Sequence, residues 1–235
     1  ICTAASDLAL EVGYRGAAMI TFVHDHTDFA LTAVDCVAPP DHATSEERSG
    51  ASFIGWRLRV HRGEALPEHE PTADGVAMEV RLLAEDPDDG FTTTPGRVTL
   101  LSFPVGTGVR VDANRRVGDR IEQTDSLLAI VTAWGPDRAV ALTRIRRALE
   151  RTAVVIENGT TNLSFLLALL DDEQFQRDEV DHRWLDRMIA DRPPPEPDPL
   201  VLLAGAVEAY EADRRRAQEA FYASAERGRP QQPDE

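Results

Sequence analysis

The sequence predicts an α+β fold, with a body that extends to about residue 190 and a helical appendage after it. Strand-length apolar runs recur along the body, at residues 76–83, 97–103 and 127–134. Apolar residues recur at helical spacing in residues 138–151. A proline-rich stretch, residues 193–199, precedes a second long helical pattern at 200–226, so we expect a stiff linker between the body and the appendage.

The first third of the chain predicts helices around a β-hairpin. We expect a helix at residues 2–12, ended by Gly13, and two strands at 17–23 and 29–34. We expect one helix over residues 46–62. Its core-facing side chains are predicted to be Phe53, Ile54, Leu58 and Val60.

The remainder of the body predicts more strands, with helices between them. Residues 85–90 read EDPDDG, which is typical of a turn. Pro136 and Asp137 are start signals for the helix at 138–151, and Thr161 with Asn162 is expected to cap another helix. The other expected elements are strands at 109–111 and 152–156 and helices at 163–170 and 180–190.

Composition excludes several kinds of chemistry. The 25 basic and 41 acidic side chains give a net charge of −16, which argues against binding to nucleic acid. Every basic residue other than histidine is arginine, so the chain has no lysine for a Schiff base, a phosphate-binding loop or a biotin attachment.

The small number of cysteines and the short apolar runs indicate where in the cell the protein is located. Cys2 and Cys36 are too few for a metal knuckle or a disulfide framework, which favours a reducing compartment and hence the cytoplasm. The apolar runs are too short to cross a membrane, so we expect no membrane partner. The chain begins at Ile1 without a methionine, and we expect it to be part of a longer polypeptide.

Several short motifs follow one another in a recognisable order. Residues 78–87 read MEVRLLAEDP, and residues 108–112 read GVRVD. The other matching pieces are VGYRGA at 12–17, WRLR at 56–59, GEALP at 63–67, DSL at 125–127, WG at 134–135, RRAL at 146–149 and TNL at 161–163. Together they resemble the C-terminal portion of the biotin carboxylase domain, an ATP-grasp domain of biotin-dependent acyl-CoA and pyruvate carboxylases.

The resemblance implies a fold and a domain division. The body, residues 1–190, would be biotin carboxylase C-terminal-like, with a mixed or antiparallel sheet and helices. Residues 1–62 would end the ATP-grasp part and residues 75–190 would form the C-terminal subdomain. After these we expect a linker at 191–199, a helical extension at 200–227 and a disordered tail at 228–235.

The family's chemistry is ATP-dependent carboxylation of biotin by bicarbonate, so the resemblance implies ATP, Mg²⁺ and biotin on a separate carrier as cofactors. The family motif V-E-F reads Ile20, Thr21, Phe22 here, with threonine in place of a metal-binding glutamate. The motif E-M-N-x-R-x-Q-V-E-H reads AVDCVAPPDH at residues 33–42. Ala33 therefore replaces the second metal-binding glutamate.

Further substitutions follow in the same motif. Val37 replaces the bicarbonate-binding arginine and Pro39 the glutamine, while His42 is kept. Asp35 stands for the asparagine and is the candidate metal ligand. Asp41 stands for the glutamate general base. Valine cannot supply a bidentate anion contact, so this pattern predicts a degenerate site.

Arg110 is the other candidate catalytic residue, because it matches a family arginine that stabilises charge near biotin. Ion pairing on a strand is the alternative for Arg110. His24, Asp25 and His26 could be metal ligands or simply turn residues. The helix at 200–226 could dock on another domain or subunit, or fold back on the body.

Three functions remain open. The preferred one is a degenerate biotin carboxylase-like domain of an acyl-CoA carboxylase that serves as structure or interaction surface. The second is part of an active carboxylase with an altered site, and the third is a module that binds a small anion or a partner. Implied partners are biotin carrier and carboxyltransferase domains or subunits and a homo-oligomer.

Overall fold

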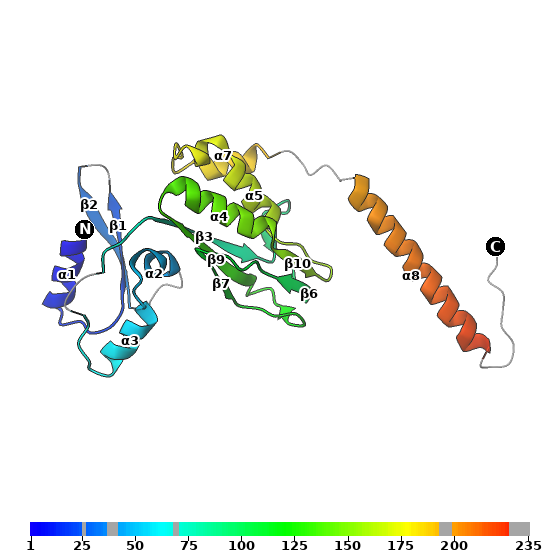
Figure 1. Ribbon diagram of the computed structural model, residues 1–235, viewed down its shortest axis with the longest axis horizontal. Helices are drawn as coiled ribbons and strands as arrows, with labels where there is room; N and C mark the ends of the chain where they lie inside the picture. Colours follow the sequence, from blue (N-terminus) through cyan, green and yellow to red (C-terminus); the bar gives the residue numbers. More distant parts are fainter. Residues whose placement is uncertain (25–26, 37–41, 68–70, 193–198, 226–235) are drawn as a thin grey trace. The chain divides into compact units, whose positions relative to one another are not determined.

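The computed structural model describes residues 1–24, 27–36, 42–67, 71–192 and 199–225 (Figure 1). The chain forms two units, residues 1–183 and residues 184–235. The first unit is an α+β body, as the sequence predicts, and its strands pair antiparallel throughout the described residues, which is one of the two arrangements that the resemblance implies. Asp41 and the tail at 228–235 lie outside the described residues, as does most of the expected linker.

The first part of the body is a hairpin with three helices. Strands β1 and β2 pair antiparallel, as predicted, and every residue of β2 is exposed. The elements are α1 (Cys2–Glu11), β1 (Met19–His24), β2 (Phe29–Asp35), α2 (Ala43–Ser49) and α3 (Phe53–His61).

The prediction of a single helix at residues 46–62 is wrong. Gly50 ends α2 with φ 66°, a left-handed conformation that glycine adopts without strain. Ser52 then starts α3, because its Oγ accepts a hydrogen bond from the Gly55 amide at 3.1 Å. Ile54 and Leu58 are about half exposed, at 52% and 54%, so the prediction that they face a core is wrong in this chain.

The second part of the body holds two three-stranded sheets, in the orders β3-β9-β7 and β10-β6-β8. Helix α4 lies across the first sheet (Figure 1), and two buried apolar clusters fill the space around the sheets. The larger elements are β3 (Val76–Leu83), β6 (Gly96–Ser102), β7 (Val109–Ala113), β9 (Leu127–Gly135), α4 (Arg138–Glu150), β10 (Ala153–Ile156) and α5 (Leu163–Asp171).

Short elements that the sequence analysis did not predict fill the connections. Strands β4 (Glu85–Asp86) and β5 (Thr92–Thr93) pair across the predicted turn, β8 (Arg120–Ile121) joins β6, and α6 (Glu173–Gln176) follows α5. In the second unit α7 (Trp184–Ala190) begins four residues later than predicted, and α8 spans Pro199–Ala225. Among the described residues, the helices lack the combination of length and apolar character that a membrane crossing needs.

The predicted start signal of α4 at Asp137 is confirmed, whereas the predicted cap of α5 by Asn162 is not. Asp137 Oδ1 accepts a hydrogen bond from the Val140 amide at 2.9 Å, which satisfies one unpaired amide of the first turn. Asn162 precedes α5 but makes no side-chain cap. Its side chain reaches β3 instead.

Asn162 completes the hydrogen bonding of β3 where the register with β9 shifts, between Leu82 and Leu83. Its Oδ1 accepts from the Leu83 amide at 2.9 Å, and its Nδ2 donates to the Arg81 carbonyl at 3.0 Å. The backbone N–H of Asn162 donates to the Leu83 carbonyl at 3.1 Å. Asn162 is only 5% exposed, so it acts as a local substitute for a neighbouring strand.

We predict that Asn162→Ala lowers the free energy of unfolding by about 1–3 kcal/mol, because the Leu83 amide and the Arg81 carbonyl lose their side-chain partner. Denaturant unfolding of the whole chain measures this change. Thr161→Ala is the matched control, since its Oγ accepts only a long bond of 3.4 Å from the Leu163 amide, and should cost under about 0.5 kcal/mol. Equal effects of the two variants would contradict this role for Asn162.

Candidate functional site

The sheet β3-β9-β7 has one apolar face and one polar face. Alternate residues of the three strands, including Val80, Val131 and Val111, pack with α4 and α5. Several intervening residues carry charged or hydroxyl groups on the opposite face, beside apolar ones such as Ile130. Glu79, Thr132 and Arg110 form one row across the sheet, because Thr132 is the register partner of both others. This polar face meets α2.

Thr132 is the central residue of this row, and its side chain is completely buried. Its Oγ1 donates a hydrogen bond to Glu79 Oε2 at 3.3 Å. A buried hydroxyl without a partner is costly, so this contact satisfies the Thr132 side chain. The next row of the same face holds Arg81 and Asp112 on either side of Ile130.

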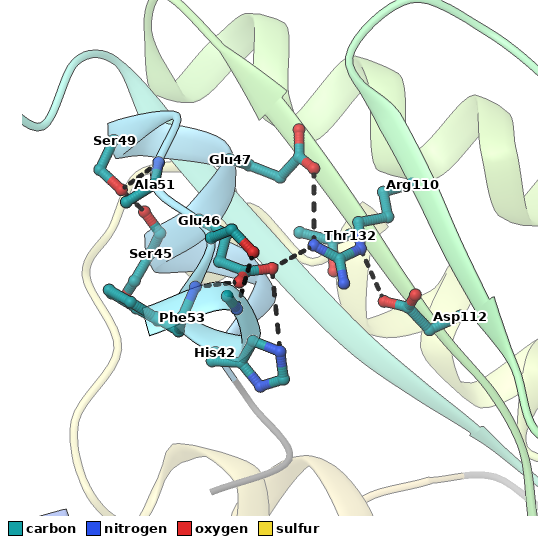
Figure 2. Close-up of polar contacts among 12 residues, drawn as sticks. His42, Ser45, Glu46, Glu47, Ser49, Ala51, Phe53, Arg110, Asp112 and Thr132 are labelled. Atoms are coloured by element: carbon teal, nitrogen blue, oxygen red, sulfur yellow. Dashed lines mark hydrogen bonds and ion pairs between the residues drawn. The ribbon is translucent and has the colours of Figure 1, made fainter. Parts of the chain in front are cut away.

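Arg110 joins the sheet to α2 through carboxylates (Figure 2). Its Nη1 donates to Glu46 Oε2 at 2.7 Å and lies 3.9 Å from Glu47 Oε1, and its Nε donates to Asp112 Oδ2 at 2.8 Å. The Glu46 side chain is 10% exposed and that of Arg110 is 28% exposed. The structure therefore shows Arg110 as the centre of a half-buried ion-pair cluster. Whether Arg110 also acts in catalysis stays a prediction.

Glu46 connects this cluster to the start of α3. Its Oε1 accepts a hydrogen bond from the Phe53 amide at 2.6 Å, and its Oε2 lies 3.8 Å from His42 Nε2. Burial of Glu46 disfavours its charge, but the hydrogen bonds from Arg110 and Phe53 outweigh that cost. The pKa of Glu46 therefore lies below its ordinary value. The hydrogen bond to Glu46 raises the pKa of Arg110.

Asp35, the predicted metal ligand, lies in the hairpin and not at the sheet. Asp35 ends β2 and is exposed, opposite Met19 of β1. Among the described residues, no hydrogen bond or ion pair joins Asp35 to Arg110, so the structure does not bring these two candidates into contact. Asp41, Val37 and Pro39 lie outside the described part of the chain, as do Asp25 and His26.

Two positions of the expected metal site face each other. Thr21 and Ala33 are direct cross-strand partners in the β1-β2 ladder, so their side chains lie on the same face of the hairpin. Asp35 is two residues from Ala33 on that face. Within the described ranges, no group of three or more histidine, cysteine or acidic side chains is placed to hold a metal ion.

The sequence did not predict that Glu46, Glu79 and Thr132 belong to a polar site. The alternation of β3 and β9 was a usable signal, because Glu79 and Thr132 are polar residues between apolar ones. Glu46 gave no comparable signal. Its contact with Arg110 joins residues 64 positions apart, and only the packing of α2 on the sheet creates it.

We predict that Glu46→Gln lowers the free energy of unfolding by about 2 kcal/mol at pH 7, because a charge-assisted bond to Arg110 is lost. A lowered pKa stabilises the fold at pH values above the ordinary glutamate pKa of about 4.3, and this stabilisation disappears as the pH falls through the lower folded-state value. The stability difference between wild type and Glu46→Gln should therefore shrink below about pH 4.

Denaturant unfolding from pH 7 to pH 3 measures that difference. Glu47→Gln is the matched control, since Glu47 lies 3.9 Å from Arg110 without a hydrogen bond, and it should change stability by less than about 0.5 kcal/mol. A stability loss for Glu46→Gln that does not vary with pH would argue against the ion pair.

Comparisons with known proteins agree with the geometry of the body. Residues 79–187 match the family model described as biotin carboxylase C-terminal domain. Biotin carboxylase of Nostoc sp. is 31% identical over 189 residues, which are 79% of this chain and 42% of that protein. Biotin carboxylase 1 of Bacillus subtilis is 31% identical over 188 residues, which are 78% of this chain and 41% of that protein.

A solved structure shows the same fold. The biotin carboxylase domain dimer of Hydrogenobacter thermophilus 2-oxoglutarate carboxylase, in complex with MgADP, ADP and bicarbonate, superposes with a TM-score of 0.75 at 26% identity. The match covers 81% of this chain and 43% of that one. The chain thus spans about two fifths of the length of the curated relatives described above. Residues 79–187 are a biotin carboxylase C-terminal domain. The chain belongs to the biotin carboxylase family and corresponds to a C-terminal portion of the whole biotin carboxylase domain.

Proposed function

We propose that this chain is part of a biotin-dependent acyl-CoA carboxylase and that it serves as a structural and interaction domain whose catalytic site is degenerate. The observation that carries the proposal is the pairing of Thr21 with Ala33 across the hairpin. By resemblance these are the positions of two metal-binding glutamates. Two carboxylates at directly opposed positions could share one cation, whereas a hydroxyl and a methyl group cannot.

The residues present do not fit the family's Mg²⁺ site. Mg²⁺ is held in proteins by one or two carboxylates together with phosphate oxygens and water. Asp35 lies on this face of the hairpin, two residues from Ala33; it stands at the asparagine position and opposite Met19. One exposed aspartate is a poor substitute for a pair of opposed glutamates, so we derive no catalytic step through a metal.

The surroundings of Arg110 also support a structural role. Its guanidinium contacts the carboxylates of Glu46 and Asp112 and lies near that of Glu47. One positive charge among three negative ones leaves a net negative cluster. Such a cluster repels an anion such as bicarbonate and would not stabilise negative charge that develops in a reaction.

Other domains or subunits would supply the parts of the carboxylase activity that this chain lacks. The chain has no lysine, so it cannot carry biotin. We propose that a biotin carrier and a carboxyltransferase are partner domains or subunits, and that ATP and Mg²⁺ bind outside this chain, in the cytoplasm. We retain the domain division given above, with residues 1–62 as the end of the ATP-grasp part and 75–190 as the C-terminal subdomain.

An active carboxylase with an altered site is the second candidate. Asp35 favours it, because this carboxylate lies on the same face of the hairpin as Thr21 and Ala33. In that case Asp35 would hold the metal, Asp41 would act as base and Arg110 would stabilise charge. Metal binding by the chain distinguishes the two candidates.

We predict that the wild-type chain binds Mn²⁺, a spectroscopic probe for a Mg²⁺ site, no tighter than about 1 mM. Thr21→Glu/Ala33→Glu should bind Mn²⁺ at least about tenfold more tightly, because it restores two opposed carboxylates. Electron paramagnetic resonance of free Mn²⁺ measures both affinities. Thr21→Gln/Ala33→Gln is the matched control of equal size. Wild-type affinity equal to that of the glutamate variant, lost in Asp35→Asn, would favour the active alternative.

Activity gives a second test. A longer polypeptide that carries this chain should show no bicarbonate-dependent ATP hydrolysis above background. Hydrolysis that falls by about 10²–10³ in Arg110→Ala, with the fold intact by circular dichroism, would refute the degenerate site and support a charge-stabilising role for Arg110.

A further inference from the structure

A cavity with two adjoining compartments lies between helix α3 and the segment that joins α1 to β1. The larger compartment has a volume of about 620 Å³ and the smaller one about 410 Å³. Both volumes are in the range that proteins use to bind small molecules. The residues that line both compartments are Gly16, Ala17, Ile54, Arg57 and Val60.

The larger compartment is cationic, although the whole chain has a net charge of −16. Arg15, Arg57 and His61 line it, and none of its described lining residues is acidic. Within the described part of the chain, neither Arg15 nor Arg57 has a carboxylate partner, whereas Arg59 and Arg62 lie within 4.0 Å of Glu64. The two guanidinium groups at the cavity are therefore available to an anion.

The smaller compartment is mainly apolar. The rings of Phe53 and Trp56 lie 5.4 Å apart, centroid to centroid, and Leu66 is 44% exposed. Its polar lining residues besides Arg57 are His42 and Ser45. Accessible apolar surface in a concave site gains free energy when a ligand covers it.

Arg57 connects the two compartments. Positions 54, 57 and 60 of α3 line both of them, and their spacing of three residues places them in one row along the helix. Arg57 is the charged member of this row. A ligand whose acidic group contacts Arg57 can therefore extend its apolar part into the smaller compartment.

The backbone on both sides of the cavity is held in place. The Tyr14 hydroxyl donates a hydrogen bond to the Ala17 carbonyl at 2.9 Å, which closes the turn that carries Arg15. On the other side, Glu46 Oε1 accepts from the Phe53 amide at 2.6 Å and anchors the start of α3. A site whose backbone is already ordered loses less conformational entropy when it binds a ligand.

The charges select the kind of ligand. A guanidinium donates two parallel hydrogen bonds to a carboxylate, and one carboxylate can accept from two guanidinium groups. The net charge of −16 opposes ligands that carry several negative charges, so it favours a monoanion over a phosphate ester. The apolar compartment favours a hydrocarbon body over a purely polar one.

We propose that this cavity binds an amphipathic monocarboxylate. Arg15 and Arg57 hold its carboxylate, and its hydrocarbon body lies against Phe53 and Trp56. The proposal does not depend on whether the site at the hairpin and sheet is active, because the lining residues include none of Thr21, Ala33 and Arg110.

Isothermal titration calorimetry of the whole chain with octanoate tests the ligand class. Octanoate should bind at least about tenfold more tightly than acetate, which lacks the hydrocarbon body, and than octanol, which lacks the charge. Octyl phosphate tests the head group, and it should bind no more tightly than octanoate because it carries more negative charge.

Arginine variants test the position of the carboxylate. Arg15→Gln/Arg57→Gln should weaken octanoate binding at least about tenfold, because two charge-assisted contacts are lost. Arg59→Gln/Arg62→Gln is the matched control, since it removes the same charge from the same region but neither residue lines the cavity. This control should change the affinity less than about twofold. Circular dichroism verifies that each variant keeps its fold.

Cysteine alkylation locates the bound ligand. Cys36 lines the larger compartment and Cys2 does not, and both thiols are exposed. Saturating octanoate should slow alkylation of Cys36 by iodoacetamide at least about threefold and leave Cys2 unchanged. Absence of octanoate binding, equal affinity for octanol, tighter binding of octyl phosphate, equal losses in the two arginine variants, or unchanged alkylation of Cys36 would each overturn the proposal.

Discussion

A half-buried ion pair between Arg110 and Glu46 holds the polar face of the sheet β3-β9-β7 against α2. The sheet needs such a partner, because one face is apolar and filled by α4 and α5, while the other carries Glu79, Thr132 and Arg110. Charges that are partly removed from water are costly unless they are paired. The position of α2, its junction with α3 at Phe53 and the polar row of the sheet therefore depend on one another.

The ion pair also limits what this face can do. A guanidinium that is positioned to stabilise negative charge on a substrate must not already be neutralised by its neighbours. Arg110 has Glu46 and Asp112 at hydrogen-bond distance and Glu47 within ion-pair range. Arg110 is therefore better placed to hold α2 on the sheet than to bind an anion. This is one of two physical observations that support the proposed structural role.

The hairpin provides the other support. Its ladder brings Thr21 opposite Ala33, and a ladder of this kind depends on backbone hydrogen bonds, so it tolerates many side chains. A fold can therefore be retained when the side chains that supplied its chemistry are replaced. The resemblance of this chain to biotin carboxylases identifies the fold, whereas its function depends on particular side chains.

Most strands and helices of the body could be predicted from the sequence. Apolar alternation in residues 76–83 and 127–134 anticipates β3 and β9, and Asp137 anticipates the start of α4, because these signals are local. The division of residues 46–62 into two helices was missed. The left-handed turn at Gly50 and the cap at Ser52 interrupt a region whose polar and apolar residues are also compatible with one continuous helix.

The sequence by itself determined the family resemblance, the chemistry that a chain without lysine cannot perform, and the long helical pattern at residues 200–226, since each is a property of residue identity and order. Only the tertiary structure decided that Arg110 is paired with Glu46, that Thr21 faces Ala33 and that Asn162 bonds to β3 instead of capping α5. The partners in the first and third of these contacts are 64 and 79 residues apart, and those of the second are 12 apart. No local pattern specifies such contacts, because they depend on how separate strands and helices come together.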